Sequence, residues 1–498
     1  MYKKQCLLGI DLGTTFLKVS VFDRTTGRVI AQDGVRLTVR ELPDGGREQD
    51  MPSIMRVLKR IARKLKNNNP TAWKRIAGIG VASQGGSSII VSSDGTPRTP
   101  MLLWNDARAQ GEFAEVLKRL PLSFWREVTL RDVPAHGMAR ISWLLKYRPE
   151  VFKGRRGDVL HVGAGDYLFF LLTGTWRQEA GSTIQIGPYN VKKRTLDERP
   201  LKAFGLSIDF VPPLRIGDTT ELLSDSGAAL LDLNADIPVA GPYIDQEAGY
   251  RCAAVTVDAP LHVSLGTAWV GNFLIDERMA GYAPYQLLLP GPDRNRRLIV
   301  LPLLTGNATW EWALREFTPK GNAQAIAEAN TVLKAKPFPH AGLHLLPWNA
   351  QDNPLLPANY GGGAFIGMNT QTTRDDMLSA AALGLVCEFA RVFSILRDKR
   401  AVKSVVLSGG ASKGEHFRKL MATLLAPLPV YWQTDSDLAG ARGALVVFES
   451  KAAQAELKRV PLPDKKFLNE ARNRASEYNA IIDRLYGHVK AGRPYALN

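Results

Sequence analysis

Apolar and polar residues alternate at the start of the chain with the period of two that β-strands require. The alternation runs through residues 6–11, 16–23 and 29–39, and short polar turns separate these segments. The turn at 24–28, Arg-Thr-Thr-Gly-Arg, contains the glycine that a tight reversal favours. We therefore predict three strands joined as a meander.

Residues 51–66 follow a helical period instead. Asp50 precedes this segment and Pro52 falls in its first turn, which is the usual arrangement at a helix start. The apolar face consists of Ile54, Val57, Leu58, Ile61, Ala62 and Leu65. Residues 76–83 and 88–93 are apolar runs interpreted as buried strands, so this region is predicted to form one α/β layer.

Helical patterns dominate between residues 113 and 172, and Gly174 follows the last of them in the position of a C-terminal glycine cap. We interpret a region of about 113–235 as a helical insertion. Proline and glycine break the pattern between 236 and 250, so the main domain boundary is predicted near Tyr250. The two domains would then be residues 1–250 and 251–498.

The second half of the chain repeats the plan of the first. Residues 260–276 are predicted as strand, Leu-Gly-Thr turn and strand, and residues 401–425 as strand, glycine turn and helix. So long a period is not that of a solenoid, and it indicates a duplicated domain that faces its copy. Apolar positions from Phe467 onward predict a terminal helix docked on the second domain.

Length and composition agree with this organisation. A chain of 498 residues with 45% hydrophobic and 22% charged residues exceeds what one hydrophobic core serves, so two domains or more are expected. No uninterrupted apolar segment has the length of a membrane span, and we expect a cytoplasmic protein without a membrane partner. Cys6, Cys252 and Cys387 are too scattered to indicate a disulfide framework or a zinc site.

The formal net charge of +16 raises the question of a nucleic-acid partner. The basic residues are mixed with acids, as in the segments 153–158 and 191–199, and form no basic arm. We therefore expect no nucleic-acid binding and favour small phosphorylated metabolites as ligands. The sequence does not determine the oligomeric state, and it is compatible with a homodimer.

The two Leu-Gly-Thr turns carry the first candidate chemistry. In Asp-Leu-Gly-Thr-Thr, residues 11–15, the backbone around Gly13 and the hydroxyls of Thr14 and Thr15 can converge on an anion. Lys18 adds a positive charge, and Asp11 is the hard anionic oxygen ligand that Mg²⁺ prefers. In the second copy, residues 264–268, Ser264 replaces the carboxylate, and Gly266 and Thr267 form the turn. This asymmetry favours a nucleotide polyphosphate between the two halves.

A third turn follows the valine-rich strand of the second half. Gly409 and Gly410 would let a base or ribose approach the backbone, and Ser412 can cap the next helix. Without the other motifs it is equally well an ordinary strand-to-helix turn. The sequence has neither a P-loop nor a dinucleotide fingerprint here.

Two further segments are candidates for the acceptor side. A kinase that phosphorylates a hydroxyl needs a base, and Asp245 lies ahead of a predicted helix start where its charge would be stabilised. The alternative is that Asp245 is only the N-cap of that helix. Trp104, Asn105 and Asp106 offer an aromatic wall beside polar groups, as sugar sites do, or a buried Trp with capping neighbours.

Other kinds of site are disfavoured. His340 and His344 have metal-ligand spacing but no acid beside them, so we expect no zinc site. The sequence has no Gly-x-Ser-x-Gly elbow and no cysteine in an activating context, which disfavours a hydrolase.

Taken in order, these motifs resemble the carbohydrate kinases named for a Phe-Gly-Gly-Tyr signature. The likeness spans nearly the whole chain and lies in segments 9–23, 102–109, 165–176, 241–250, 263–270 and 405–425. It implies an α/β fold of two ribonuclease-H-like, actin-like ATPase domains with a cleft between them. Within the family the chain looks most like xylulokinases, which implies phosphoryl transfer from ATP to a ketopentose, with the conversion of D-xylulose to its 5-phosphate as the first expectation.

The resemblance also implies residue roles. Asp11 would serve the metal and phosphates, and Asp245 would be the catalytic base. Gly266 with Thr267, and Gly409 with Gly410, would hold ATP. The cofactor-binding residues are expected to be Gly13, Thr14, Thr15, Lys18, Gly266, Thr267, Gly409, Gly410 and Ser412, and the substrate-binding residues Gln84, Trp104, Asn105, Asp106, Asp245 and Gln246.

Two departures from the xylulokinase pattern concern the sugar. Residues 83–88 read Ser-Gln-Gly-Gly-Ser-Ser, so Gln84 matches the family but Gly85 and Gly86 replace its Met-His pair. Gln246 and Glu247 stand where xylulokinases favour Asn-Ala, which would alter the acceptor pocket. Ribulose, heptulose, glycerol or a signalling polyol remain alternative acceptors, and a non-catalytic actin-like ATP-binding regulator is an alternative from another class.

Overall fold

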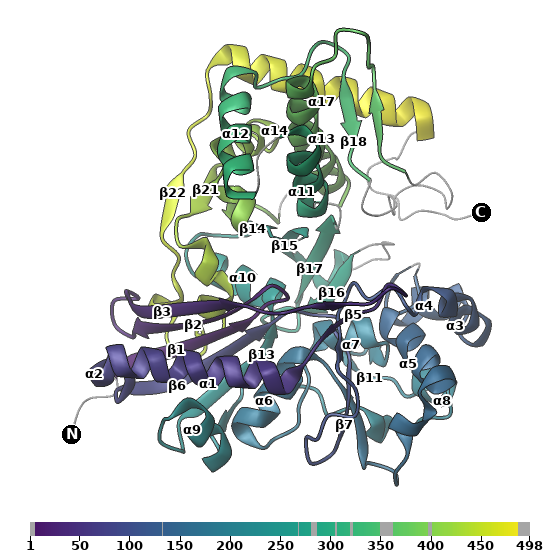
Figure 1. The fold of residues 1–498 in the computed structure, drawn as a ribbon, viewed down its shortest axis with the longest axis vertical. Helices are drawn as coiled ribbons and strands as arrows, with labels where there is room; N and C mark the ends of the chain where they lie inside the picture. Colours follow the sequence, from purple (N-terminus) through teal and green to yellow (C-terminus); the bar gives the residue numbers. More distant parts are fainter. Residues whose placement is uncertain are drawn as a thin grey trace.

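Two mixed β-sheets, one from each half of the chain, form the centre of the molecule in a computed structural model (Figure 1). The structure describes residues 5–131, 133–266, 268–279, 286–303, 306–318, 322–348, 362–396 and 401–486. In Figure 1 the first half, purple to teal, lies below the second half, green to yellow.

The first sheet has the strand order β12-β13-β6-β1-β2-β3. The predicted meander is confirmed, since β1, β2 and β3 pair antiparallel in sequence. β1 also pairs in parallel with β6, and β6 with β13. The strands are β1 (Cys6–Leu12), β2 (Phe16–Asp23), β3 (Val29–Arg36), β6 (Ile76–Ser83), β12 (Thr220–Leu222) and β13 (Pro238–Ile244).

The parallel strands bring three distant segments to one edge of this sheet. Leu12 on β1 and Ile244 on β13 both lie level with Ser83 on β6. The carboxyl ends of parallel strands are where α/β sheets bind ligands. Residues 11–15, 84–86 and 245–246 therefore meet at one edge.

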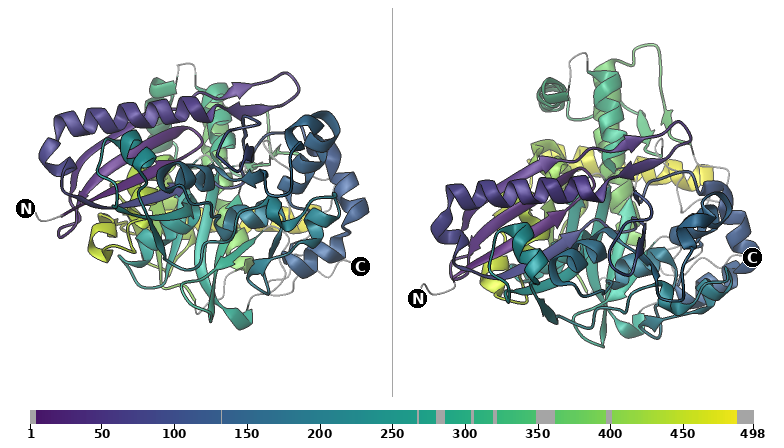
Figure 2. Two further views of the ribbon diagram at one scale, coloured as in Figure 1. Left: turned by 90° about the horizontal axis from the view of Figure 1, so that it is seen from below. Right: turned by 60° about the horizontal axis from the view of Figure 1, so that its bottom comes forward.

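The outer face of the first sheet is covered by α1 (Met51–Asn68), α6 (Ala164–Thr173) and α9 (Asp225–Leu231). α1 begins as predicted, because the Asp50 carboxylate accepts a hydrogen bond from the Ser53 N–H at 2.9 Å. Gly174 ends α6 with φ 74°, the left-handed conformation of the expected glycine cap. Figure 2 shows α1 along the outer side of this sheet.

One strand pairs differently from the prediction. β7 (Ile89–Ser92) pairs antiparallel with β9 (Val159–Val162) in a separate two-stranded sheet, not with the main layer. α3 (Phe113–Arg119), α4 (Leu122–Val128) and α5 (His136–Tyr147) share a core of their own. This helical region forms one end of the molecule in both views of Figure 2. The predicted insertion of 113–235 also contains β12 and α6, which belong to the main layer.

The second sheet has the order β16-β17-β15-β14-β20-β21-β22 and confirms the predicted repeat of the plan. β14 pairs antiparallel with β15 and parallel with β20, as β1 does with β2 and β6. Its strands are β14 (Pro260–Leu265), β15 (Trp269–Asp276), β16 (Leu287–Pro290), β17 (Arg296–Leu303), β20 (Ser404–Ser408), β21 (Val430–Gln433) and β22 (Leu457–Arg459).

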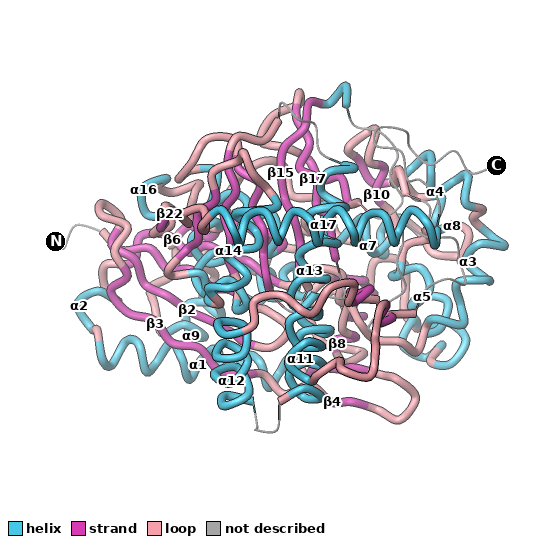
Figure 3. The backbone as a smooth tube through the Cα atoms, turned by 90° about the horizontal axis from the view of Figure 1, so that it is seen from above, coloured by secondary structure: helices cyan, strands magenta, loops and turns pink. Residues whose placement is uncertain are grey.

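Helices α13 (Arg374–Leu396), α14 (Glu415–Leu424) and α17 (Lys465–Tyr486) pack together in the second half. α17 is the predicted terminal helix and runs across the other two in Figure 3. Of the helices in the described residues, α13 alone has the length and composition of a membrane span, and 83% of that stretch is buried inside the protein. It therefore serves as a core helix here.

The remaining elements connect these layers. In the first half they are β4 (Arg40–Glu41), β5 (Arg47–Gln49), β8 (Met101–Leu102), β10 (Tyr189–Asn190), β11 (Thr195–Leu196), α2 (Pro70–Trp73), α7 (Ala180–Ile186) and α8 (Arg199–Lys202). In the second half they are α11 (Gly306–Phe317), α12 (Asn322–Ala335), α16 (Ser450–Ala453), β18 (His344–Leu346) and β19 (Ala364–Ile366). The three cysteines are free and buried.

Two short helices lie between the halves. α10 (Asp245–Ala254) contacts strands of both sheets, and α15 (Ala439–Gly443) contacts α10 and the first sheet. Their backbones almost touch, since a Cβ on Gly443 would lie 1.7 Å from the carbonyl oxygen of Ala248. A Cβ on Gly80 in β6 would lie 2.6 Å from the carbonyl oxygen of Ala444. The predicted boundary near Tyr250 falls inside α10.

Replacing Gly443 by Ala is therefore expected to force the two helices apart. Overpacking at such a contact costs about 1–3 kcal/mol. Urea unfolding of Gly443→Ala should show this loss of stability. Gly111→Ala is the matched control, because nothing lies within 4 Å of a Cβ there and its stability should stay near that of the wild type. Equal stability of the two variants would contradict the close crossing of α10 and α15.

Candidate active site

A cavity of about 700 Å³ opens between the two sheets at the shared strand edge. Most of the residues singled out from the sequence line it: Asp11, Gly13, Thr14, Thr15, Lys18, Gln84, Trp104, Asn105, Asp106, Asp245, Gln246, Ser264, Gly266, Gly409 and Gly410. Thr267 lies outside the described residues. The folded chain therefore gathers both Leu-Gly-Thr turns, the glycine turn and Asp245 around one space.

Asp11 stands at the end of β1, directly opposite Lys18 on β2. Burial raises the pKa of the Asp11 carboxyl, and the positive charge of Lys18 opposes this rise. Gly440 of α15 packs against this carboxylate, since a Cβ there would lie 2.8 Å from Asp11 Oδ2. Asp11 is thus a partly desolvated carboxylate at the cavity wall, held between the two halves.

The glycine turns of the second half leave room beside them. Nothing lies within 4 Å of a Cβ built on Gly410, and Gly266 meets only distant neighbours. The capping role expected for Ser412 is wrong, because Gly414 is the N-cap of α14. Ser412 is fully buried, and its hydroxyl donates to the carbonyl oxygen of Gly409 at 2.7 Å. It braces the turn and does not line the cavity.

Asp245 is the first residue of α10, and the N-cap position belongs to Ile244. The N-cap alternative for Asp245 therefore does not apply. Its Oδ1 accepts a hydrogen bond from the Gln246 N–H at 2.9 Å. Burial and then the negative charge of Asp11 raise the pKa of Asp245 to about 7, against that hydrogen bond. A carboxylate with this pKa is poised to exchange a proton near neutral pH.

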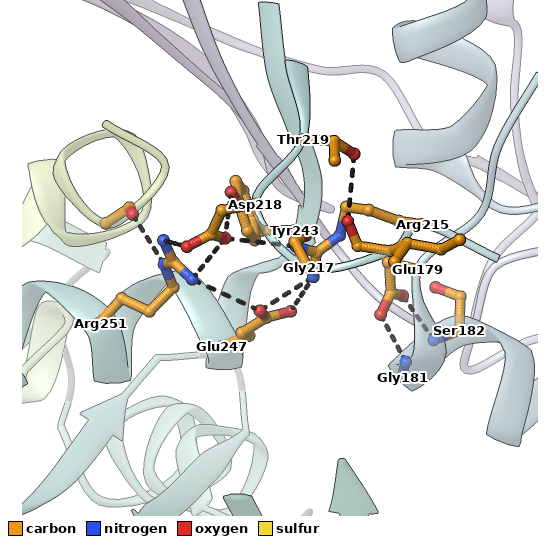
Figure 4. Close-up of polar contacts among 12 residues, drawn as sticks. Glu179, Gly181, Ser182, Arg215, Gly217, Asp218, Thr219, Tyr243, Glu247 and Arg251 are labelled. Carbon is orange, nitrogen blue, oxygen red and sulfur yellow. Dashed lines mark hydrogen bonds and ion pairs between the residues drawn. The ribbon is translucent and has the colours of Figure 1, made fainter. Parts of the chain in front are cut away.

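The side of α10 that faces away from the cavity is fixed by ion pairs (Figure 4). Arg215 donates to both oxygens of Glu247 at 2.9 Å, and Arg251 forms two 2.9 Å bonds with Asp218. Both guanidinium groups lie over the ring of Tyr243, at 4.2 and 4.6 Å from its centroid. These contacts hold the helix that carries Asp245. The expectation that Glu247 alters the acceptor pocket is wrong, because its side chain is directed into this network.

The aromatic wall of the cavity is held by hydrogen bonds to the first turn. Trp104 Nε1 donates to Thr14 Oγ1 at 3.1 Å, and Thr14 Oγ1 donates to Gln84 Oε1 at 2.8 Å. Ser87 also donates to Gln84 Oε1. Gln84 is only 2% exposed, so its amide orients Thr14 and Trp104 within this chain of contacts.

The polar residues beside Trp104 differ in their freedom. The carboxylate of Asp106 is paired with Arg108 at 2.6 Å and accepts the Arg47 N–H at 2.9 Å. Asn105 Oδ1 is buried at the cavity without a hydrogen-bond partner among the described residues. Gln246 Oε1 accepts from Asn272 at 3.0 Å. Asn105 therefore presents a buried polar atom without a partner at the cavity.

The cavity residues that were not singled out from the sequence include Arg131, His136, Arg140 and Gln185. Enclosure in the cavity and the charges of Arg140 and Arg131 lower the pKa of His136 to about 3, so its imidazole is neutral at physiological pH. No motif marked these positions, because His136 and Arg140 on α5, Gln185 on α7 and Arg131 in the segment before α5 are brought together only by the tertiary structure. His344, in contrast, pairs with Glu477 at 3.2 Å, and the described residues contain no cluster of metal-binding type.

Comparison with known proteins identifies this arrangement. The model of the N-terminal domain of the FGGY family of carbohydrate kinases matches residues 6–252, and that of the C-terminal domain matches residues 304–448. The chain belongs to the FGGY family of carbohydrate kinases.

Relatives of this FGGY kinase align with nearly its whole length. A probable L-xylulose kinase of Haemophilus influenzae is 24% identical, with 97% of this chain and 98% of that protein covered. The ligand-bound xylulose kinase of Lactobacillus acidophilus has a TM-score of 0.81 at 20% identity, covering 96% of this chain and 98% of that one. The gluconate kinase of the same organism has a TM-score of 0.80 at 19% identity, covering 96% and 98%. The two-domain actin-like ATPase fold expected from the sequence is thus confirmed.

Membership of a kinase family implies ATP, and the turns of this FGGY kinase fit a nucleotide and a magnesium ion. Gly266 and Gly410 leave the space that phosphate and ribose need. Asp11 gives the cavity one hard anionic ligand, and a Mg²⁺ ion usually takes one or two carboxylates and completes its shell with phosphates and water. The donor set therefore suits a metal that arrives with the nucleotide.

The raised pKa of Asp245 predicts a pH-dependent cost to folding. Because the folded pKa of about 7 exceeds the ordinary aspartate value of 3.8, stability present at low pH is lost as the pH rises from 3.8 through about 7. Asp245→Asn avoids this loss, so its melting temperature relative to the wild type should be higher at pH 8 than at pH 5. Asp276→Asn is the control, because its pKa of about 2 leaves it ionised at both values. A pH-independent difference for Asp245→Asn would refute the raised pKa.

Proposed function

We propose that this FGGY kinase transfers the γ-phosphoryl group of ATP to a hydroxyl of a ketopentose, with D-xylulose as the first candidate acceptor. The observation that carries the proposal is the position of Asp245, a carboxylate with a pKa of about 7 in the same cavity as both Leu-Gly-Thr turns. The relative from Haemophilus influenzae, named a probable L-xylulose kinase, supports a ketopentose as the acceptor class.

Asp245 would act as the general base. Its carboxylate accepts the proton of the acceptor hydroxyl while that oxygen forms a bond to the γ-phosphorus, and the bond from this phosphorus to the β-phosphate bridging oxygen breaks. ADP and the sugar phosphate are the products. The hydrogen bond from the Gln246 N–H and the start of α10 hold Asp245 in place for this step.

The other residues would bind and orient. Asp11 would hold Mg²⁺, which neutralises charge on the phosphates, and Lys18 with the backbone around Gly13 would contact phosphate oxygens. Gly266, Gly409 and Gly410 would line the nucleotide. Thr14 and Gln84 would position Trp104 against the sugar, and Asn105 would contact a sugar hydroxyl. Closure of the two halves would exclude water, the competing acceptor.

The acceptor is tested by coupled ADP release over a panel of D-xylulose, L-xylulose, ribulose, a heptulose and glycerol. The proposal expects the highest kcat/KM with a ketopentose. A clear preference for glycerol or a heptulose would replace the ketopentose as the proposed acceptor, and the absence of acceptor-dependent turnover would favour the ATP-binding regulator.

We further propose that the protein acts in the cytoplasm on a small-molecule substrate and does not bind nucleic acid.

Removing the base should separate chemistry from binding. Asp245→Ala is expected to lower kcat for sugar-dependent ADP formation by about 10²–10⁴-fold, because general-base assistance is lost. ATP affinity, measured by calorimetry, should stay nearly unchanged. Turnover like that of the wild type would remove Asp245 from the mechanism.

The two Leu-Gly-Thr turns should respond differently to truncation. Asp11→Ala is expected to impair turnover more strongly than Ser264→Ala and to raise the Mg²⁺ concentration needed for half-maximal rate, because only the first turn carries a carboxylate. Mg²⁺ titrations of both variants measure this. Greater damage from Ser264→Ala would contradict the assignment of the metal to the first turn.

A further inference from the structure

Buried polar side chains cross the second sheet beneath α10. Along β14, leucine and valine side chains enter the hydrophobic core, while His262 between them faces the other way. Asn272 lies directly opposite His262 on β15, and Ser408 ends the neighbouring strand β20. His262 and Ser408 are 2% exposed, and Asn272 is fully buried. Polar groups in such positions cost free energy unless they are paired, so their presence calls for a reason.

Hydrogen bonds join these side chains to the start of α10. Asn272 Nδ2 donates to Gln246 Oε1 at 3.0 Å and lies 3.1 Å from His262 Nδ1. His262 Nε2 lies 2.8 Å from Ser408 Oγ. Asn272 pairs through its nitrogen, because its Oδ1 is buried without a partner among the described residues. We call Gln246, Asn272, His262 and Ser408 the buried polar network.

The partners of His262 determine which ring nitrogen carries the proton. An amide nitrogen only donates, so His262 Nδ1 accepts from Asn272. Burial lowers the pKa of His262 to about 4, so the imidazole is neutral near pH 7 and its proton lies on Nε2. This N–H therefore donates to Ser408 Oγ, and the hydroxyl proton of Ser408 is left to donate to another group.

Both ends of the buried polar network line the cavity, in parts with different proposed tasks. Gln246 follows the proposed base Asp245, and Ser408 directly precedes the turn at Gly409. Because Asn272 holds Gln246 Oε1, the N–H groups of that amide are the end left for an acceptor hydroxyl. The free hydroxyl proton of Ser408 suits a nucleotide oxygen, since phosphate oxygens accept hydrogen bonds.

The helix α10 packs directly on this network. A Cβ on Gly249 would lie 2.4 Å from His262 Cε1 and 3.1 Å from each ring nitrogen, so the imidazole lies against the helix backbone. The same helix contacts strands of the first sheet. The position of α10, which carries Asp245, therefore depends on the position of the His262 ring.

We propose that His262 is a positioning residue that couples the acceptor end of the cavity to the nucleotide end. Through Asn272 it orients Gln246 for the acceptor hydroxyl, and through its own N–H it directs the Ser408 hydroxyl toward the nucleotide. This inference rests on the proposed kinase activity and adds a mutual dependence of the two substrates. Bound nucleotide and bound acceptor each tighten the binding of the other.

Other roles of these residues predict different behaviour. If the network only filled the space beneath α10, substitutions would lower stability without a selective effect on either substrate. If each end acted alone, changes at Ser408 would affect the nucleotide and changes at Asn272 would affect the acceptor. Coupling through His262 instead predicts that a change at one end alters the binding of the substrate at the other end.

The first experiment measures these cross effects by ADP release with the best acceptor of the panel. Asn272→Leu is expected to raise the KM for ATP, and Ser408→Ala the KM for the acceptor, each by about fivefold or more. Ser408→Thr keeps the hydroxyl and should return the KM for the acceptor to near that of the wild type. Ser404→Ala removes a buried hydroxyl at the other end of β20 and is the matched control, with both KM values unchanged.

The second experiment tests His262 by calorimetric titration with a non-hydrolysable ATP analogue. The wild type is expected to bind the analogue at least about fivefold more tightly with saturating acceptor than without it, and His262→Leu to reduce this factor below about twofold. Thermal melting checks that each variant folds. If His262→Leu does not fold, the cross effects of Asn272→Leu and Ser408→Ala test the proposal.

The outcomes distinguish this inference from the kinase proposal. The coupling is overturned by an equal factor in the wild type and His262→Leu, by no effect of the acceptor in the wild type, or by variants that affect only the substrate at their own end. Each of these results leaves the kinase proposal intact. No turnover with any acceptor overturns the kinase proposal, and the coupling with it.

Discussion

The crossing of α10 and α15 between the two sheets is the contact on which the site depends. It is possible only because Gly443 lets its backbone reach the carbonyl of Ala248. α10 begins with Asp245, and α15 places Gly440 against Asp11. The packing of two backbones thus sets where the carboxylates of Asp11 and Asp245 stand relative to each other.

The electrostatics of the cavity follow from this packing. Burial raises the pKa of both Asp11 and Asp245, and the charge of Asp11 raises that of Asp245 further. Away from the cavity, the acid Glu247 on the same helix is neutralised by Arg215. α10 therefore has one side of compensated charge, which anchors it, and one end where a carboxylate keeps its proton near neutral pH.

On the acceptor side, residues that are neighbours in the sequence make different contacts. Of the Trp-Asn-Asp segment, Trp104 is held by Thr14, Asp106 is held by Arg108, and Asn105 keeps an unused oxygen. The side chain of Gln84 accepts a hydrogen bond from Thr14 within the cavity wall and so supports this segment. These differences arise from partners distant in the chain, so spacing within the motif could not reveal them.

The sequence by itself determined the local plan: the strand meander, the α1 start at Asp50, the glycine end of α6 and the repeat of a Leu-Gly-Thr turn after matched strands. These features depend on periodicity and on residues a few positions apart. Only the tertiary structure decided that β7 joins β9, that Glu247 turns away from the cavity and that Arg131 enters it. Each of those outcomes depends on contacts between segments far apart in the chain, which no local pattern records.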